Sequence, residues 1–386
     1  MANIKKYKKK DGSTAYMFQA YLGTDPDTGN RIRVTRQGFS TKKEAELVLS
    51  RLKIDIDEGS FIKAHNDTFE AIYELWFEQY RNTVKESTLQ KTSELFRVHI
   101  LPVFGKMKMD KITAAYCQKK VNGWFKVHSK YNVMKNYTSS VLKFAMRLDM
   151  LKSNPMDKIT MPRRMAEVGK DEDLKFYNKD ELQQFFGCCN ADAERSNNML
   201  WLTLFRLLAF SGMRKGEALA LTWKDLDFVN ETVSINKTLT RGLENRLIIQ
   251  TPKTATSKRA IVLDAITLSM LNNWRKQQAK DFLKLGFNTM NENQLIFPNT
   301  KNELMIPTKP DQKLDRIIKK NELKRITIHG FRHTHCSLLF EAGASVKEVQ
   351  DRLGHSDIQT TMNIYAHVTE KAKEKTAEKF AKYVNF

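Results

Sequence analysis

Hydrophobic and polar positions alternate along two early segments of the chain and then recur at helical spacing. STAYMFQAYLG and RIRVTRQGF have strand character, and the turn-rich TDPDTGN between them predicts a hairpin. In the second segment Ile32 and Val34 alternate with basic and polar residues, which predicts one apolar face. Arg31 and Arg33 lie on the opposite face. The next segment, TKKEAELVLSRLKIDI, has apolar residues at helical spacing, so a helix should cover the apolar face and leave the basic face open.

The pattern becomes helical throughout residues 66–158. Apolar residues recur at helical spacing in TFEAIYELWFEQYRNTV, ESTLQKTSELFRVHI, DKITAAYCQKKVNGWFKV and VMKNYTSSVLKFAMRLDM. The second of these helices is predicted to end before Pro102, because proline interrupts a helix. A four-helix domain that ends near Asn154 and Pro155 is the simplest arrangement.

Residues 159–175, ITMPRRMAEVGKDEDLK, combine proline, glycine and dense charge, which indicates a linker. From residue 176 to residue 386 helices flank the strand-like segments TVSINKTL, RLIIQTP and RAIVLD. RLIIQTP and RAIVLD are joined by a short polar loop and are expected to form a hairpin. We therefore expect a multidomain, mainly α-helical chain with small antiparallel sheets: a β-sheet plus helix at 1–60, a helical domain at 66–158 and an α+β domain at 176–386.

The charge of the chain indicates a class of partner. It has 65 Lys and Arg residues against 44 Asp and Glu, a formal net charge of +21. Such an excess favours a polyanionic partner, because basic side chains that neutralise phosphates release condensed counterions. A basic protein with no such partner is the alternative. The candidate DNA-binding residues are Arg31, Arg33, Lys85, Lys91, Arg97 and Lys143. The alternative is that these residues are ordinary solvated charges on the surface.

The cysteines and the apolar runs indicate a compartment. The four cysteines include no Cys-x-x-Cys pair, so free thiols in a reducing cytoplasm are expected. The N-terminus has no apolar core of signal-peptide length, and no later run reaches the roughly 18 apolar residues that a membrane span needs. We expect a soluble cytoplasmic protein with no membrane partner.

Two segments of the third region carry candidate chemistry on basic residues. In LAFSGMRKGEALALTWKDLDF an apolar helix stops at Gly212 and another begins, which leaves Arg214 at the junction. Its guanidinium can meet an anion there, or it can pair structurally with Glu217. In IQTPKTATSKRAIVLD, Lys253 lies near the turn, where a lysine is either a solvated charge or delivers an ammonium group to a substrate.

A third segment, ITIHGFRHTHCSLLFEAGASVKEVQDRLGHSDIQTTMNIYAHV, holds histidines, an arginine and a tyrosine. In the helix expected for HGFRHTHCSLLFEAG, His329 and Arg332 lie three residues apart on one face. The next helix is expected to end at Gly354, immediately before His355. Tyr365 lies one helix further along and, judged by its neighbours alone, is a packed tyrosine.

Neither a metal nor a nucleotide is expected. His329 and His333 could share a helix face, yet no acidic third ligand or cysteine pair has matching spacing for zinc. The glycines of GMRKGE do not have the spacing of a phosphate-binding loop. No cofactor is therefore predicted.

Taken in order, SGMRKGEALALTW, TPKTATSKR, HGFRHTHCSLLFEAG and LGHSDIQTTMNIYAHV closely resemble the motifs of the tyrosine recombinases, specifically phage and conjugative-transposon integrases. The resemblance covers essentially the whole chain. Residues 66–158 resemble the core-site-binding domain of the family, and residues 1–60, the least specific part, resemble the arm-site-binding domain. By position, the implied catalytic residues are Arg214, Lys253, His329, Arg332, His355 and the nucleophile Tyr365.

The resemblance implies a covalent mechanism. Tyr365 would attack a DNA phosphodiester and form a 3′-phosphotyrosine with a free 5′-hydroxyl, while two arginines stabilise the developing charge. Lys253 would act as general acid, although Lys258 and Arg259 lie on the same predicted hairpin. His329 and His355 would assist proton movement and hold the phosphate.

The implied function is the integration and excision of a mobile element or prophage in a bacterial host, at its nucleoid. The implied partners are double-stranded DNA attachment sites, a homotetramer assembled on DNA with exchange of C-terminal tails, and an excision factor. Three alternatives stay open: a chromosome-dimer resolvase of the same family, a topoisomerase of the same chemistry, and a non-catalytic DNA-binding regulator. The interval from His355 to Tyr365 is one residue longer than in those resolvases, which favours an integrase.

Overall fold

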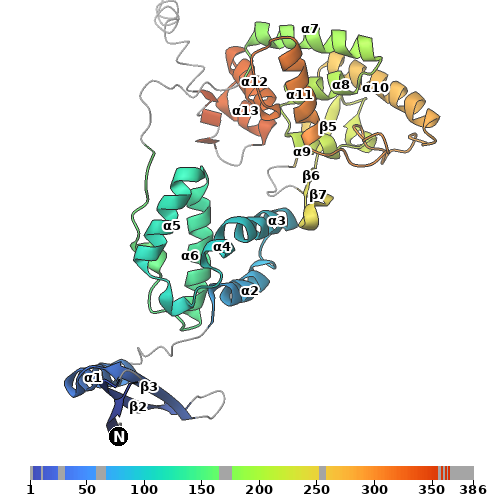
Figure 1. Ribbon diagram of the computed structural model, residues 1–386. Coiled ribbons are helices and arrows are strands. Elements are labelled where there is room, and N and C mark those ends of the chain that lie inside the picture. Colours follow the sequence, from blue (N-terminus) through green and yellow to red (C-terminus); the bar gives the residue numbers. More distant parts are fainter. Residues whose placement is uncertain are drawn as a thin grey trace, which may run out of the picture. The chain divides into compact units, whose positions relative to one another are not determined.

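The computed structural model describes residues 3–9, 12–24, 31–57, 67–164, 176–251 and 258–354, with 358–359, 361–362 and 364–365 beyond them. The chain divides into two compact units, residues 1–85 with 91–165 and residues 86–90 with 166–386. Figure 1 shows a strand-containing N-terminal part, a helical part and a mixed C-terminal part.

The N-terminal part is an antiparallel sheet of three strands with one helix. Strands β1 (Asn3–Lys8), β2 (Thr14–Thr24) and β3 (Arg31–Phe39) pair in that order, and α1 (Lys42–Asp57) follows. The predicted β2–β3 hairpin is confirmed. Strand β1 was not predicted, because its run of lysines hides the strand pattern that Ile4, paired with Phe18, completes.

Helix α1 covers the apolar face of this sheet. Phe18 and Ala20 are buried against Ala45 and Leu49 of α1. Val34 is buried on the same sheet, whereas its neighbours on either side are exposed, so the predicted alternation is confirmed over this part of β3. The side chains of residues 31 and 32 lie outside the described set.

The helical part packs its helices around an aromatic core. Its elements are α2 (Phe69–Tyr80), α3 (Glu86–Leu95), a π-helical turn (Phe96–Ile100), α4 (Leu101–Phe104), α5 (Ala114–Val127), α6 (Tyr131–Arg147) and a 3₁₀ turn (Pro155–Lys158). Phe69, Phe96 and Phe104 are fully buried there.

The expected end of this helix before Pro102 is confirmed, since α3 ends at Leu95 and the π-helical turn after it ends at Ile100. The chain continues helically through the π-helical turn into α4, where Pro102 occupies the first turn. A proline is tolerated at that position because the first N–H groups of a helix need no intrahelical acceptor. The π-helical turn provides the change of hydrogen-bond register that creates such a start inside a longer helical run.

The residues after α6 remain attached to the helical part. The buried Asn154 amide donates to Ser139 Oγ at 2.7 Å, and its oxygen accepts from the Met156 backbone at 3.0 Å. The Thr160 backbone donates to Gln118 Oε1 at 2.8 Å. The first residues of the predicted linker are thus fixed by hydrogen bonds, and residues 165–175 lie outside the described set.

The C-terminal part combines helices with two small sheets. Its helices are α7 (Lys179–Ser196), α8 (Leu200–Ser211), α9 (Lys215–Ala220), α10 (Ala265–Lys284), α11 (Thr308–Lys320), α12 (Ile328–Glu341) and α13 (Val346–Leu353). Strands β4 (Leu226–Asp227), β5 (Thr232–Ile235) and β8 (Arg259–Val262) form one sheet, and β6 (Thr238–Arg241) pairs with β7 (Leu247–Gln250) in the other.

The predicted hairpin between β7 and β8 is wrong, although both strands exist. β7 pairs with β6, and β8 pairs with β5. The two sheets separate between β5 and β6, where Asp225 holds the chain: Asn236 Nδ2 donates to Asp225 Oδ1 at 3.4 Å, and Lys237 Nζ lies 2.6 Å from Asp225 Oδ2. These two contacts fix the chain where it passes from one sheet to the other. β7 and β8 therefore lie in different sheets.

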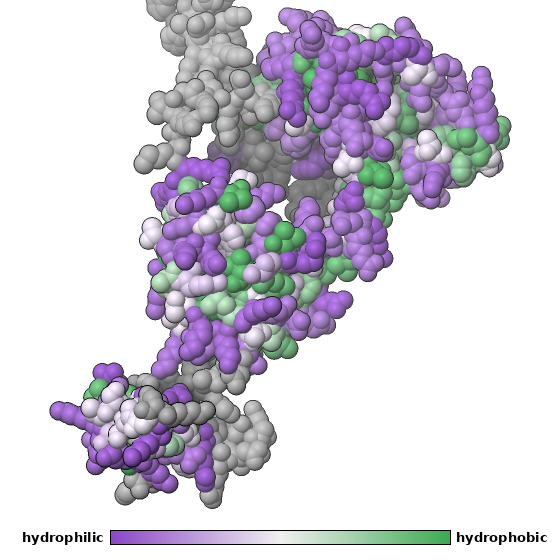
Figure 2. All heavy atoms as spheres, viewed as in Figure 1, coloured by the Kyte–Doolittle hydropathy of each residue, from purple (hydrophilic) through white to green (hydrophobic). Residues whose placement is uncertain are grey.

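Helix α8 lies at the centre of the C-terminal part. Leu204, Phe205 and Leu207 are fully buried, and the helix packs against α7, α10 and α12. Burial of such a side chain contributes about 1.5–3 kcal/mol each. Figure 2 shows that the surface of this part is mostly hydrophilic on the face in view. The apolar side chains of the core are buried beneath it. None of the described helices has both the length and the apolar character needed to cross a bilayer.

Candidate active site

The junction of α8 and α9 presents Arg214 as the sequence predicted. Gly212 ends α8 in the left-handed conformation with φ 65°, and Arg214 is the residue before α9. A Cβ atom on Gly212 would lie 2.5 Å from Leu353 and 2.7 Å from His335, so the end of α8 closely approaches α12 and α13. A glycine is therefore required both for its backbone conformation and for this approach.

Glu217 holds Arg214 by two bonds. The Arg214 backbone donates to Glu217 Oε2 at 2.8 Å, and Arg214 Nη1 donates to Glu217 Oε1 at 2.9 Å. Arg214 Nη2 reaches the Gly354 carbonyl at 3.4 Å, a long hydrogen bond. The arginine side chain is 40 % exposed, so its guanidinium is accessible from solvent while it is oriented by a buried carboxylate. The predicted structural pair with Glu217 and an anion-binding role are thus compatible.

Arg332 approaches the same place from α12. Its Nη1 donates to the Gly212 carbonyl at 2.9 Å and its Nη2 to the Leu353 carbonyl at 2.8 Å. The residue is only 2 % exposed. Burial, together with the charge of Arg214, lowers the pKa of Arg332 to about 9, so the guanidinium stays charged at neutral pH. Arg332 therefore fixes the ends of α8 and α13 beside Arg214.

Two histidines of α12 lie next to this pair of arginines. The rings of His329 and His333 meet edge to face with centroids 4.8 Å apart. His329 keeps an exposed edge, but desolvation of its ring and the neighbouring His333 lower its pKa to about 4, and the charges of both arginines act in the same direction. At neutral pH His329 is therefore an uncharged imidazole that can accept a proton.

Tyr365 follows α13 in a helical stretch. Ile364 beside it is buried in a small cluster whose other members are Cys336, Phe340, Val349 and Leu353. The Tyr365 ring stands edge to face against Phe340 with centroids 5.0 Å apart, and the residue remains 36 % exposed. The stretch is thus anchored by Ile364, while the tyrosine lies partly at the surface.

The remaining predicted site residues have less defined places. Lys253 and His355 lie outside the described residues. Lys91, Arg97 and Lys143 are exposed on the helical part, Lys85 is half-buried at the start of α3, and Arg33 is exposed on β3. Within the described ranges no three His, Cys, Asp or Glu side chains gather in a way that could hold a metal ion.

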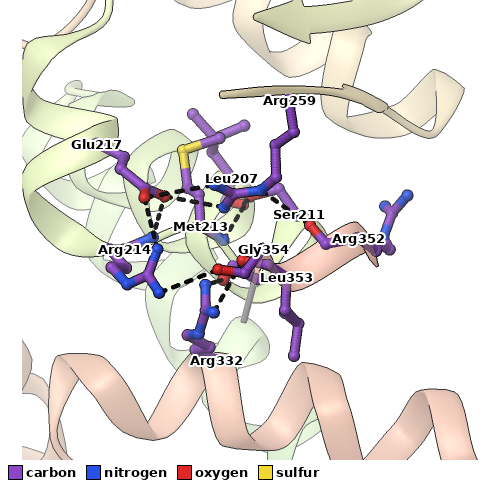
Figure 3. Close-up of polar contacts among 11 residues, drawn as sticks. Leu207, Ser211, Met213, Arg214, Glu217, Arg259, Arg332, Arg352, Leu353 and Gly354 are labelled. Atoms are coloured by element: carbon purple, nitrogen blue, oxygen red, sulfur yellow. Dashed lines mark hydrogen bonds and ion pairs between the residues drawn. The ribbon is translucent and has the colours of Figure 1, made fainter. Parts of the chain in front are cut away.

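A third arginine, Arg259, belongs to the cluster, whereas the sequence indicates it only as an alternative to Lys253 on the predicted hairpin. Its Nη2 lies 2.9 Å from Glu217 Oε2, and its Nε donates to the Arg352 carbonyl at 3.0 Å. Figure 3 shows Glu217 between Arg214 and Arg259, with Arg332 directed at the end of α13. The sequence signal for Arg259 was weak because its partners are distant along the chain.

Comparison with known sequences identifies the family. The model of the Phage integrase family matches residues 175–372, more than half of the chain. The chain belongs to this family. Its expected identity as a tyrosine recombinase is confirmed, and with it the expected class of enzyme, a tyrosine site-specific recombinase. Two further matches agree with the predicted fold class: an Arm DNA-binding domain at residues 3–56 and a Phage integrase, N-terminal SAM-like domain at residues 68–125.

The similarity of this phage integrase family member to individual relatives covers most of its length. The ICEBs1 integrase of Bacillus subtilis (strain 168) is 27 % identical over 379 residues, which cover 96 % of this chain and 98 % of the relative. The Tn1549 transposon integrase in complex with transposon right end DNA has a similar fold, with a TM-score of 0.65, 22 % identity and coverage of 82 % of this chain and 100 % of that structure. A lambda integrase tetramer bound to a Holliday junction matches with a TM-score of 0.55, 15 % identity and coverage of 93 % and 94 %.

Proposed function

We propose that this protein integrates and excises a mobile genetic element in bacteria by cutting and rejoining double-stranded DNA at attachment sites, with Tyr365 as the nucleophile. The observation that carries the proposal is the convergence of Arg214 and Arg332, from separate elements, on the last turn of α13. This turn leads directly to His355 and, one short helical stretch later, to Tyr365.

The cluster suits phosphodiester cleavage because it concentrates charge around an accessible guanidinium. Arg214 and Arg332 carry two positive charges against the one negative charge of Glu217, before Arg259 is included. Guanidiniums bind the non-bridging oxygens of a phosphate in a planar fork, and their attraction grows as negative charge develops in the transition state. Arg214 would contact the phosphate directly, and Arg332 would hold the surrounding backbone in place.

The reaction then needs two proton transfers. The Tyr365 oxygen bonds to phosphorus, the bond from phosphorus to the 5′ oxygen breaks, and the product is a 3′-phosphotyrosine with a free 5′-hydroxyl. A phenol has an ordinary pKa near 10, so it must lose its proton to a base during attack. The uncharged His329 would accept it, with His355 as the alternative acceptor. Lys253 would donate the proton that the departing 5′ oxygen takes. Reversal of these steps rejoins the DNA without a nucleotide.

The proposed assembly is a tetramer on DNA. The folds of the Tn1549 integrase with transposon DNA and of the lambda integrase tetramer on a Holliday junction support it. The near-complete match to the ICEBs1 integrase supports a mobile element as the substrate and a bacterial cytoplasm, at the nucleoid, as the place of action. Exchange of C-terminal tails and an excision factor belong to the same proposal. A chromosome-dimer resolvase and a non-catalytic regulator are the alternatives.

Covalent capture on nicked DNA tests the proposal. Wild-type protein is mixed with a pool of nicked duplexes with randomised centres, and adducts that survive denaturant are recovered and sequenced. We expect adducts that share a core sequence, that form without added metal or ATP, and that disappear in Tyr365→Phe. Tyr383→Phe is the matched control and should form adducts as the wild type does. Tight DNA binding without any adduct would instead support the regulator.

A further inference from the structure

Arg259 joins the two expected catalytic arginines at the end of α13, yet the proposed reaction gives it no role. The three consecutive carbonyl oxygens there each accept a hydrogen bond from a guanidinium that comes from a different element (Figure 3). The pairs are Arg259 Nε with Arg352 at 3.0 Å, Arg332 Nη2 with Leu353 at 2.8 Å, and Arg214 Nη2 with Gly354 at 3.4 Å. Cations are favoured there because the last carbonyls of a helix lack intrahelical partners and carry the negative end of its dipole.

Arg259 also shares a buried carboxylate with Arg214. Oε1 of Glu217 accepts from Arg214 Nη1 at 2.9 Å and from Arg259 Nη1 at 3.4 Å. Oε2 accepts from the Arg214 backbone at 2.8 Å and from Arg259 Nη2 at 2.9 Å. The Glu217 and Arg259 side chains are only 4 % and 7 % exposed, so this ion pair is shielded from solvent, unlike Arg214.

The electrostatics of the cluster make Arg259 the main partner of Glu217. Burial raises the pKa of Glu217, but its hydrogen bond with Arg259 and the charge of Arg259, followed by Arg214, bring the pKa below the ordinary value. Glu217 is therefore an anion at neutral pH and needs a cation beside it. If Arg259 were absent, Arg214 would be the nearest remaining cation on this carboxylate. Glu217 is shielded from solvent, so its charge, no longer shared with Arg259, would hold the Arg214 guanidinium more strongly and draw it away from a phosphate.

We propose that Arg259 is a positioning residue for strand cleavage: it neutralises Glu217 so that Arg214 keeps its guanidinium for the scissile phosphate, and it fixes the last turn of α13. This inference rests on the proposed function, since it takes Arg214 to meet the phosphate. The second effect matters because the turn leads directly to His355. Arg259 itself touches no reacting atom in this scheme.

The test compares the rate of adduct formation in a variant without Arg259 with the rate in a double variant that also lacks the Glu217 charge. The substrate is one nicked duplex recovered by covalent capture with the wild type, and both its dissociation constant and the single-turnover rate of adduct formation are measured. In Arg259→Gln we expect the rate to fall about tenfold to 100-fold, the effect of a misplaced catalytic group, with DNA affinity changed far less. In the double variant Glu217→Gln with Arg259→Gln we expect most of that rate to return, because no carboxylate then captures Arg214.

A matched pair elsewhere in the same part of the chain serves as the control. Arg206 is 15 % exposed on its side chain and pairs with Asp264 at 2.9 Å, and its hydrogen bonds go to Asp264 and Thr267 and not to Glu217 or the end of α13. Arg206→Gln, alone or with Asp264→Asn, should leave the rate of adduct formation at the wild-type value in protein that is folded at the assay temperature. The control thus separates general loss of a partly buried ion pair from loss of Arg259.

Three results would overturn the proposal: a wild-type rate in Arg259→Gln, equal rates in the single and double variants, or a loss confined to DNA affinity. If Arg259→Gln does not fold, Arg259→Lys decides, because it keeps the charge but not the fork. A rate within about tenfold of the wild type supports the charge role, and a larger loss contradicts it. Failure of the proposed function itself would look different, since the wild type would then form no adduct.

Discussion

Arg214 and Arg332 are both expected catalytic residues, but their surroundings differ. Arg214 is 40 % exposed on its side chain and makes one long bond to the end of α13. Arg332 is almost fully buried and directs two nitrogens at backbone carbonyls. Arg214 can release the Gly354 carbonyl while Glu217 still holds its guanidinium, whereas any movement of Arg332 would leave two buried carbonyls without donors, at about 1–3 kcal/mol each. The structure thus combines an adjustable arginine with a fixed one.

His335 is a buried histidine whose neutral form is enforced by its partners. Its Nδ1 lies 2.9 Å from the Ala209 carbonyl and must donate, so Nε2 is left to accept from Arg352 Nε at 3.0 Å. Burial, followed by the charge of Arg352, lowers the pKa of His335 to about 4. A proton on Nε2 would oppose the Arg352 donor. His335 thereby links the end of α8 to α13 only while it is uncharged.

This pairing predicts a loss of stability in mild acid. In the unfolded chain His335 has a pKa near 6.5, so as the pH falls below that value the unfolded state takes up a proton that the folded state refuses until about pH 4. Stability from this group is complete above pH 6.5 and declines towards pH 4. Between pH 7 and pH 5 the decline should be about 2 kcal/mol. His335→Asn should have a lower free energy of unfolding at pH 7, but that free energy should fall by about 2 kcal/mol less than the wild type's between pH 7 and pH 5. Urea unfolding at the two pH values measures both changes. Equal falls in the variant and the wild type would contradict the assignment.

At the scale of elements, the site depends on how closely α8 approaches α13. Gly212 ends α8 with positive φ, and its Cα faces Leu353 and His335. The same glycine offers its carbonyl to Arg332. One residue therefore sets the distance between two helices and the position of a buried guanidinium.

Gly212→Ala should destabilise the C-terminal part by about 2–4 kcal/mol, because the added methyl group both overpacks the contact and strains a left-handed backbone. Gly187→Ala is the matched control: Gly187 lies within α7, and a Cβ there would meet nothing within 4 Å. The control should be neutral or stabilising by up to about 1 kcal/mol, since alanine favours helix more than glycine does. Denaturant unfolding of both variants measures the difference, and equal stabilities would show that the approach of α8 to α13 is looser than described.

Elements with local signals were predictable, and pairings over long distances were not. The glycines that end α8 and α13 each act on the last turn of their own helix, and both helix ends were expected from the sequence. The partner of β8 was missed, because alternating residues predict a strand but do not specify its neighbour.

The same limit explains what the sequence could show of the site. Arg214, Arg332 and Tyr365 could be predicted because ordered motifs resemble those of a family, not because of spacing alone. Arg259 joins the cluster through Glu217, 42 positions away, and Arg352, 93 positions away, and neither separation leaves a pattern in the sequence. Geometry was needed to find it.

At the scale of the whole molecule, the net charge of +21 is distributed over parts with separate proposed contacts. The exposed Arg33 side chain lies on the sheet opposite the face that α1 covers. If this face binds arm sites, its arginines should neutralise phosphates there and have no part in cleavage at the crossover site.

Replacement of Arg31 and Arg33 by alanine should weaken binding to an arm-site duplex and lower the slope of its logarithmic salt dependence by about 2, because each arginine would neutralise one phosphate. Adduct formation on the crossover duplex should not change. Lys42→Ala with Lys43→Ala removes the same charge from α1 and should have a smaller effect on the slope. Gel-shift titrations at several salt concentrations measure these slopes, and unchanged arm-site affinity in the arginine variant would reject this face as the DNA-binding surface.

The most direct test of the proposed cleavage chemistry is to identify the residue that is covalently joined to the DNA. The covalent adduct captured by the wild type is digested with protease and nuclease, and the peptide that keeps a nucleotide is sequenced by mass spectrometry. We expect a single modified residue, Tyr365, joined to a 3′-phosphate. A nucleotide on any other residue, or one attached through a 5′-phosphate, would contradict the proposed mechanism.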